Sequence, residues 1–270
     1  MVLEQIIKNR WIKGKEHAVL LAFIYSLIAL ISARLIFPKS IGLMSIAFTS
    51  VLLIPSLNNL LAAEENQNVR EKKHSLKLLW RDHNDIIKVY ILMFLGIFLA
   101  YGITAVLFDT TIISSWFSPQ LRAAGITGKA IDSSSVFLSI VKNNLIIFLV
   151  CFLLSLVYGA GAVIFLAWNA SVWGVVFGFF AKISSLSIGI NKFSYFFNQL
   201  IPFLPHMLTE GLSYVGAAIV GGILSKAIIR EKIGTKNFNK VFIDALMALG
   251  VGIVVVIAAG VIEVYLFGSG

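Results

Sequence analysis

The sequence predicts an all-α, polytopic transmembrane bundle of about seven helices. Hydrophobic residues make up 59% of the 270-residue chain and charged residues only 13%, which is more apolar surface than the core of a soluble domain can bury. The apolar residues also form runs long enough to cross a bilayer. Lysine and arginine lie mainly between these runs, as is typical of membrane proteins. We therefore treat residues 1–270 as a single integral membrane domain.

The N-terminal half, residues 1–136, contains three predicted spans. These spans cover residues 18–37, 42–63 and 86–108. The apolar part of the first span is too long for a typical signal-peptide core, so we expect it to be retained. Pro55 is expected to kink the second span, where Asn58 and Asn59 place two amides near its end. The charged segment 64–85 carries a few apolar residues and predicts a cytoplasmic surface helix.

The C-terminal half, residues 137–270, contains four predicted spans. A long polar connection over 109–142 precedes them, and it is expected to lie outside the membrane and to hold an interfacial helix. The spans cover residues 143–168, 172–181, 204–225 and 241–266. A break at 169–171 separates the first two. The span over 172–181 is short; if it is re-entrant the count falls to six, but we favour seven.

The basic residues predict the orientation of the chain. The N-terminal segment, residues 64–85 and residues 226–240 each carry several lysines or arginines. Seven spans place all three on one side, so the N-terminus is expected in the cytoplasm of a cell-membrane protein and the C-terminus outside. Basic residues so close to spans suit lipid headgroups and protein partners rather than nucleic acid, despite the net charge of +9.

One predicted span carries ionisable side chains inside an apolar run. His206 and Glu210 are four residues apart, so they share a helix face that continues through Ser213, whereas Tyr214 is assigned to another face. Ionisable groups within a span usually point into the bundle and mark a site. Glu263, toward the outer end of the last span, becomes a third member if the last two helices pack together.

The pair of His206 and Glu210 has three open interpretations. The two residues can lock the bundle structurally, handle a substrate or a proton, or bind a metal. Two ligands are fewer than zinc requires, and the chain contains no H-E-x-x-H motif. The sequence therefore assigns no metal, no cofactor and no catalytic residue. Asp244, closer to the cytoplasmic end of its span, is expected to pair with Lys240 or a headgroup.

Small and amide residues indicate where helices pack. Asn144, Cys151, Ser155 and Gly159 follow one stripe, and Gly161 lies just beyond it. Gly174 and Gly178 form a G-x-x-x-G pattern, which brings helices close and allows a homodimer. Amides within a span need partners, which draws attention to Asn143, Asn144 and Asn169. We expect Asn169 to cap the fifth span.

An ordered set of these motifs resembles the stage II sporulation protein M family over about residues 140–230. The set comprises Asn143–Asn144–Leu145, Gly159, Gly161, Asn169, Gly174, Gly178 and Pro205–His206–x–x–x–Glu210. Met207 stands where the family usually has glycine. The resemblance implies a polytopic helical core with His206, Glu210, Asn144 and Asn169 as its polar members. In spore-forming bacteria the family name implies a scaffold that recruits cell-wall-degrading partners.

Three hypotheses for the function follow. The first is a membrane scaffold that binds lipids and protein partners through its basic loops. The second is a transporter or lipid-handling protein whose polar cluster contacts a headgroup or an ion. The third is an intramembrane metal-dependent hydrolase, for which Glu263 is the candidate further ligand. A sealed polar cluster favours the first hypothesis, and a groove open to lipid favours the second.

Overall fold

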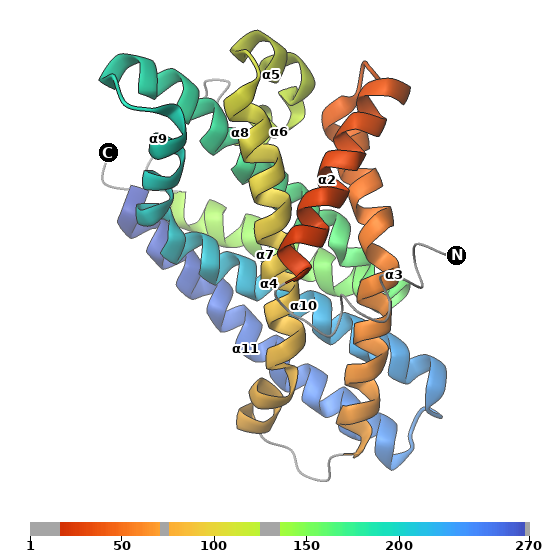
Figure 1. The fold of residues 1–270 in the computed structure, drawn as a ribbon. Coiled ribbons are helices and arrows are strands. Elements are labelled where there is room, and N and C mark those ends of the chain that lie inside the picture. Colours follow the sequence, from red (N-terminus) through yellow and green to blue (C-terminus); the bar gives the residue numbers. More distant parts are fainter. Residues whose placement is uncertain (1–16, 71–75, 125–135, 268–270) are drawn as a thin grey trace. The chain divides into compact units, whose positions relative to one another are not determined.

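The computed structural model of the protein describes residues 17–70, 76–124 and 136–267. All of its regular structure is helical, and no strand occurs in these ranges. Figure 1 shows the elements. Their bounds are α2 (His17–Ile36), α3 (Ile41–Arg70), α4 (Leu76–Leu107), α5 (Thr110–Trp116), α6 (Ser118–Ala123), α7 (Val136–Tyr158), η2 (Ala160–Ala162), α8 (Val163–Ile188), α9 (Lys192–Asn198), α10 (Leu200–Arg230) and α11 (Lys236–Phe267).

The prediction of about seven spans is confirmed, because 7 segments among the described residues are long and apolar enough to cross a membrane. They are His17–Ile36, Ile41–Asn58, Asp85–Leu107, Ile140–Tyr158, Ala160–Ile188, Leu200–Arg230 and Lys236–Val264. The orientation of the chain ends stays a prediction.

The predicted break at 169–171 is wrong. Helix α8 runs without interruption through Asn169, and the chain breaks instead at Gly159, where φ is +66°. The fifth span is therefore long enough to cross a membrane, at 29 residues, rather than short. An L-residue with a side chain is strained at such a φ, so glycine marks the true break.

The connections differ in part from the prediction. A separate surface helix over 64–85 is not confirmed, because α3 continues to Arg70 and α4 already begins at Leu76. The long connection after α4 contains two short helices, α5 and α6. Their placement outside a membrane stays a prediction. The basic residues of the N-terminal segment, 1–16, lie outside the described residues.

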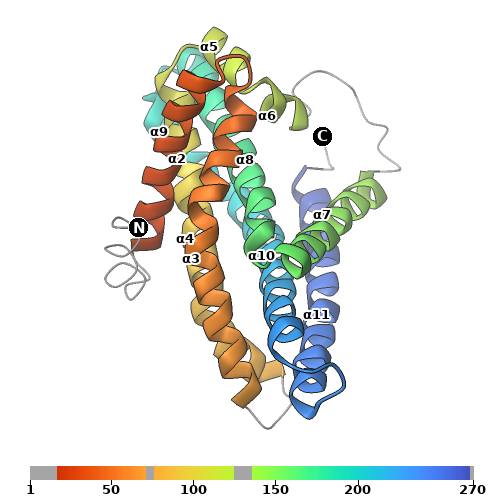
Figure 2. The same cartoon turned by 90° about the vertical axis from the view of Figure 1, so that its right-hand side faces the viewer.

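The chain forms two compact units, each assembled from three separate segments. The first unit comprises the described residues of Met1–Leu53, Leu92–Ala130 and Leu166–Leu204. Within it, α2 and the first part of α3 lie side by side as a hairpin in both views (Figures 1 and 2). Each unit takes segments from both the N-terminal and the C-terminal half of the chain.

Glycines bring α4 and α8 into close contact within the first unit. A methyl group at Gly178 would lie 2.5 Å from the backbone oxygen of Gly102, and one at Gly174 would lie 2.9 Å from the backbone nitrogen of Gly102. Both glycines of the G-x-x-x-G pair therefore lie directly against the backbone of α4. Because α4 of the same chain packs against Gly174 and Gly178, these two glycines are not available to mediate a homodimer. The homodimer itself stays a prediction.

The second unit comprises the described residues of Ile54–Ile91, Ile131–Phe165 and Pro205–Gly270. Here α10 and α11 form an antiparallel hairpin, and α7 crosses it (Figures 1 and 2). A methyl group at Gly221 of α10 would collide with the backbone oxygen of Phe152 on α7. One at Gly252 of α11 would lie 2.5 Å from the ring of Phe148. Helix α7 therefore packs against both members of the hairpin.

The junction between α7 and α8 is buried, although it joins two spans. Gly159 and Ala160 are fully enclosed, and Ala162 is 1% exposed. Backbone N–H groups that leave a helix need partners when water cannot reach them. The N–H of Ala160 donates to Oδ1 of Asn58 at 3.1 Å, and that of Ala162 donates to Oγ of Ser155 at 3.3 Å.

Candidate functional site

The candidate site is built on the first turns of α10 after Pro205. Proline has no N–H and interrupts the helical hydrogen bonds. The hydroxyl of Thr209 donates to the carbonyls of Pro205 and His206, at 2.8 and 3.0 Å, which ties this part of the helix together. His206, Glu210 and Tyr214 follow at spacings of four, so their side chains stack along one face.

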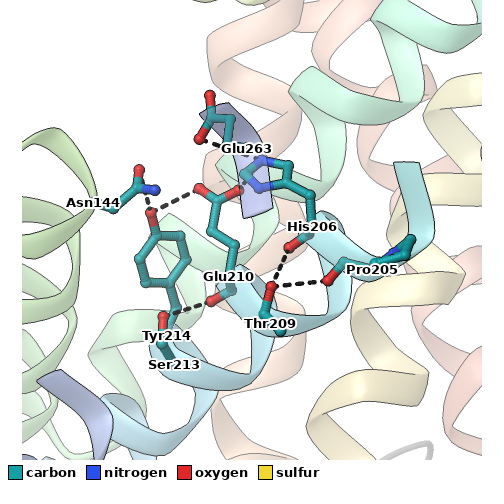
Figure 3. A network of polar contacts seen from close by, with 8 residues as sticks. All are labelled: Asn144, Pro205, His206, Thr209, Glu210, Ser213, Tyr214 and Glu263. Carbon is teal, nitrogen blue, oxygen red and sulfur yellow. Dashed lines mark hydrogen bonds and ion pairs between the residues drawn. The ribbon is translucent and has the colours of Figure 1, made fainter. Parts of the chain in front are cut away.

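Histidine 206 lies between two carboxylates from different helices (Figure 3). Its Nε2 is 3.1 Å from Oε2 of Glu210, one turn along α10, and 3.7 Å from Oε2 of Glu263 on α11. The backbone of Ala259 on α11 also contacts the imidazole ring. Helices α10 and α11 thus bring Glu263 near the pair of His206 and Glu210.

Tyrosine 214 connects this pair to α7. Its hydroxyl is 2.7 Å from Oε1 of Glu210 and 3.1 Å from Oδ1 of Asn144 (Figure 3). We call Asn144, His206, Glu210, Tyr214 and Glu263 the polar network. Its side-chain contacts join three helices, α7, α10 and α11.

The polar network is closed to its surroundings at all positions but one. Asn144, His206 and Tyr214 are 2–4% exposed, and the side chain of Glu210 is 11% exposed. The side chain of Glu263 is 27% exposed, so it forms the accessible edge. Buried hydrogen-bonded groups of this kind rigidify a bundle when they are satisfied, and their loss is costly because water cannot replace a missing partner.

The other predicted polar residues have different surroundings. Asn143 is exposed on α7, although its neighbour Asn144 is buried. Asn169 belongs to the first unit and lies half-buried inside α8, so it does not cap a helix. The hydroxyl of Ser213 donates to the carbonyl of Glu210 at 2.7 Å and thereby stays within its own helix.

The small-residue stripe on α7 is buried. Cys151 and Ser155 are fully buried and Gly159 is buried at the end of the helix. A methyl group at Gly221 of α10 would lie 3.0 Å from Cβ of Ser155. At Gly161 a methyl group would lie 2.8 Å from Cβ of Tyr158. These residues let α7 approach α10 and let the chain turn tightly after α7.

Two further results concern ions. Lys240 Nζ is 3.1 Å from Oδ2 of Asp244, which confirms the predicted pair. Among the residues that the structure describes, no group of three or more His, Cys, Asp or Glu side chains is arranged to hold a metal ion.

Tyr214 is the network member that the sequence analysis missed. The polar face predicted from the sequence continues from Glu210 to Ser213, which leaves Tyr214 on another face. Continuing the spacing from His206 through Glu210 leads directly to Tyr214. The hydroxyl of a tyrosine in an apolar span was the available signal, since buried tyrosines usually have a hydrogen-bond partner.

Comparison with protein families gives one match. The family described as Stage II sporulation protein M matches residues 89–266. This range extends beyond the motifs at about 140–230 and includes every member of the polar network. Comparisons with curated proteins and with solved structures found no match.

Proposed function

Because the chain belongs to the stage II sporulation protein M family, we propose that it is an integral membrane scaffold whose polar network fixes α7 to the α10–α11 hairpin. Scaffolds need a defined surface, and a membrane bundle obtains little rigidity from the hydrophobic effect because lipid is as apolar as its side chains. Close packing and interhelical hydrogen bonds supply it instead. The polar network supplies polar contacts between the three helices, and Gly221 and Gly252 mark where α10 and α11 pack closely against α7.

The observation that carries this proposal is the closure of the polar network. Glu210 receives one contact from Tyr214 and one from His206, so both of its carboxylate oxygens are occupied inside the bundle. Asn144 and Tyr214 bring in α7, and His206 brings in α11 through Glu263. A site that holds a substrate leaves polar atoms directed at a cavity, whereas these atoms are directed mainly at one another.

The turn between α10 and α11 is the proposed surface for lipids and partners. Arg230, Lys232 and Lys236 are exposed there, and Ile229 and Ile233 are each 76% exposed. Cationic groups beside exposed apolar side chains suit a membrane interface with anionic headgroups, or an acidic partner protein. If the predicted orientation is correct, this surface lies in the cytoplasm.

The test compares wild type with His206→Ala and Glu210→Gln in detergent, by thermal unfolding together with metal analysis. Both variants are expected to unfold well below the wild type, because each removes one partner of a buried contact. Glu231→Gln, outside the spans, is the matched control and should unfold with the wild type. Variants as stable as wild type would overturn the scaffold proposal, and loss of a bound metal from either would point to the hydrolase hypothesis.

A transporter or lipid-handling function is the second candidate, and one observation favours it. Glu263 is an ionisable residue inside a span, yet 27% of its side chain is exposed. Such groups often mark ion or substrate pathways. Flux of ions across proteoliposomes containing the purified protein, compared with a Glu263→Gln variant, tests it. Ion flux that depends on Glu263 would support transport. If no such flux is measured, the scaffold remains the proposed function.

A further inference from the structure

The charges of the polar network do not balance within it. His206 can carry at most one positive charge, whereas Glu210 and Glu263 can carry two negative charges, and Nε2 of His206 faces both carboxylates. The remaining negative charge would lie inside a membrane span, where an uncompensated charge is strongly unfavourable. One additional positive charge makes the network neutral.

The two carboxylates are not equivalent. Glu210 has contacts at both oxygens, and its side chain is 11% exposed. Glu263 reaches His206 through one oxygen at 3.7 Å, beyond ordinary hydrogen-bond length, and its side chain is 27% exposed. A proton can neutralise a carboxylate without displacing any of these contacts. Glu263 is therefore the carboxylate that can exchange a proton with the surroundings.

The hydrogen bonds of Asn144 provide an independent observation about the polar network. Its amide is 4% exposed and directed at Tyr214 (Figure 3), yet its Nδ2 has no hydrogen-bond partner among the described residues. The hydroxyl of Tyr214 has a single proton, so it cannot donate both to Glu210 and to Asn144.

Two consistent hydrogen-bond directions follow for this chain. When Glu210 is ionised, Tyr214 donates to Glu210, and the amide of Asn144 turns so that its N–H donates to Tyr214. When Glu210 is protonated, its O–H donates to Tyr214, which donates to the amide oxygen of Asn144. In the first direction the amide oxygen of Asn144 has no partner in the polar network, and in the second direction its amide nitrogen has none. The state of Glu210 is thereby transmitted to α7.

We propose that the polar network binds one exchangeable proton, which enters at Glu263 and reaches Glu210 through His206. The imidazolium gives its Nε2 proton to Oε2 of Glu210 and takes the proton of Glu263 in its place. The carboxyl group of Glu210 then turns about its Cγ–Cδ bond, so that the new O–H faces Tyr214 and the unprotonated oxygen faces Nε2 of His206. His206 is cationic before and after this step, so one proton moves from Glu263 to Glu210 and one negative charge moves the opposite way. The inference rests on the proposed scaffold, because proton uptake then regulates the contact between α7 and the α10–α11 hairpin.

Titratable groups of α10 face Glu263 among the residues that the structure describes. From α10 they are His206, Glu210 and Tyr214, each in electrostatic contact with it. On α7, Cys151 interacts electrostatically with Tyr214. A change in pH that alters the network is therefore expected to act through the two carboxylates and the histidine.

The first experiment follows the thermal midpoint of unfolding from acid to alkaline pH for the wild type and Glu263→Gln in detergent. Glutamine imitates the neutral form at every pH. The two proteins should unfold together at acid pH, and the wild type should fall below the variant as pH rises, since it then acquires the unbalanced charge. The ratio of their unfolding constants is expected to change by up to about tenfold per pH unit, the value for one linked proton. Glu231→Gln should follow the wild type throughout.

A second experiment keeps the test decisive if Glu263→Gln does not fold. Infrared difference spectra of the wild type between acid and alkaline pH should contain a protonated-carboxyl C=O band that titrates. A constant gap between wild type and Glu263→Gln, or no titrating carboxyl band in the wild type, would overturn the proton site. The scaffold proposal has its own test. It would be overturned if His206→Ala and Glu210→Gln unfolded with the wild type, whatever the pH dependence of Glu263→Gln.

Discussion

Asn58, near the end of the second span, accepts a hydrogen bond at 3.1 Å from the backbone N–H of Ala160, which is 102 residues away in the sequence. The bond satisfies a donor that the helix break at Gly159 releases inside the protein. A methyl group at Gly159 would lie 2.5 Å from Oδ1 of Asn58, so the amide sits directly against the break. The side chain of Asn58 thus holds a buried turn between two spans.

Asn58→Ala is expected to lower the free energy of unfolding by about 1–3 kcal/mol, because the N–H of Ala160 loses its partner away from water. Thermal or denaturant unfolding in detergent measures the effect. Asn143→Ala is the control, since Asn143 is an exposed amide on a neighbouring helix. Equal stability of both variants would show that the contact with Ala160 contributes nothing.

The pair of Gly221 and Gly216 tests the close approach of α10 to α7. An alanine at Gly221 places a methyl group against the backbone of Phe152, so we expect a loss of about 1–3 kcal/mol. Gly216 lies on the same helix with no atom near its would-be Cβ. Alanine there should be neutral or stabilise by up to about 1 kcal/mol, through helix propensity alone. Opposite signs of the two effects in unfolding experiments would confirm the packing, and a neutral Gly221→Ala would contradict it.

Two fully buried tyrosines give a matched test of side-chain hydrogen bonding. Tyr101 donates to Oγ of Ser45 at 2.8 Å, whereas the hydroxyl of Tyr90 has no hydrogen-bond partner within the described part of the chain. Tyr101→Phe should therefore cost about 0.5–1.5 kcal/mol. Tyr90→Phe should be neutral or stabilising, because it removes an unsatisfied polar group from the interior. Equal losses in thermal unfolding would contradict the assigned bond.

Tyr214→Phe addresses the polar network without changing its charge. The substitution removes the group that joins Asn144 to Glu210, and it leaves both buried side chains short of a partner. We expect a loss of about 1–3 kcal/mol, larger than that of Tyr101→Phe. Unfolding of the three tyrosine variants side by side provides the measurement. A Tyr214→Phe protein as stable as Tyr90→Phe would mean that the contact with α7 carries no energy.

Hydropathy and charge were sufficient to predict the number of spans, though not the boundary between the fourth and the fifth. Each span must bury its own backbone hydrogen bonds and present about twenty apolar residues to lipid. The same local reasoning also placed His206 and Glu210 on one face. These features depend on residues close together in the sequence, which is why they could be found without a structure.

Long-range contacts account for the errors. Asn169–Ala170–Ser171 resembled a break, but an amide that finds partners is tolerated inside α8, and the true break at Gly159 depends on Asn58 from a distant segment. Helix propensity cannot show this, since tertiary contacts override it. In the same way, the position of Tyr214 in the network depends on Asn144, which only the packing of α7 against α10 brings within reach.

Cys151 is the only cysteine of the chain and is fully buried on α7. A thiol reagent that cannot enter the bundle should therefore leave the native chain almost unlabelled. A single cysteine engineered beside Gly189 or beside Gly234, both of which lie at open turns, should react from opposite sides of the membrane. With a cytoplasmic N-terminus, an impermeant maleimide applied from outside should label the turn at Gly189 and spare that at Gly234. Because the native sulfur atom is buried, labelling of the engineered cysteines reports the orientation of all seven spans in the membrane.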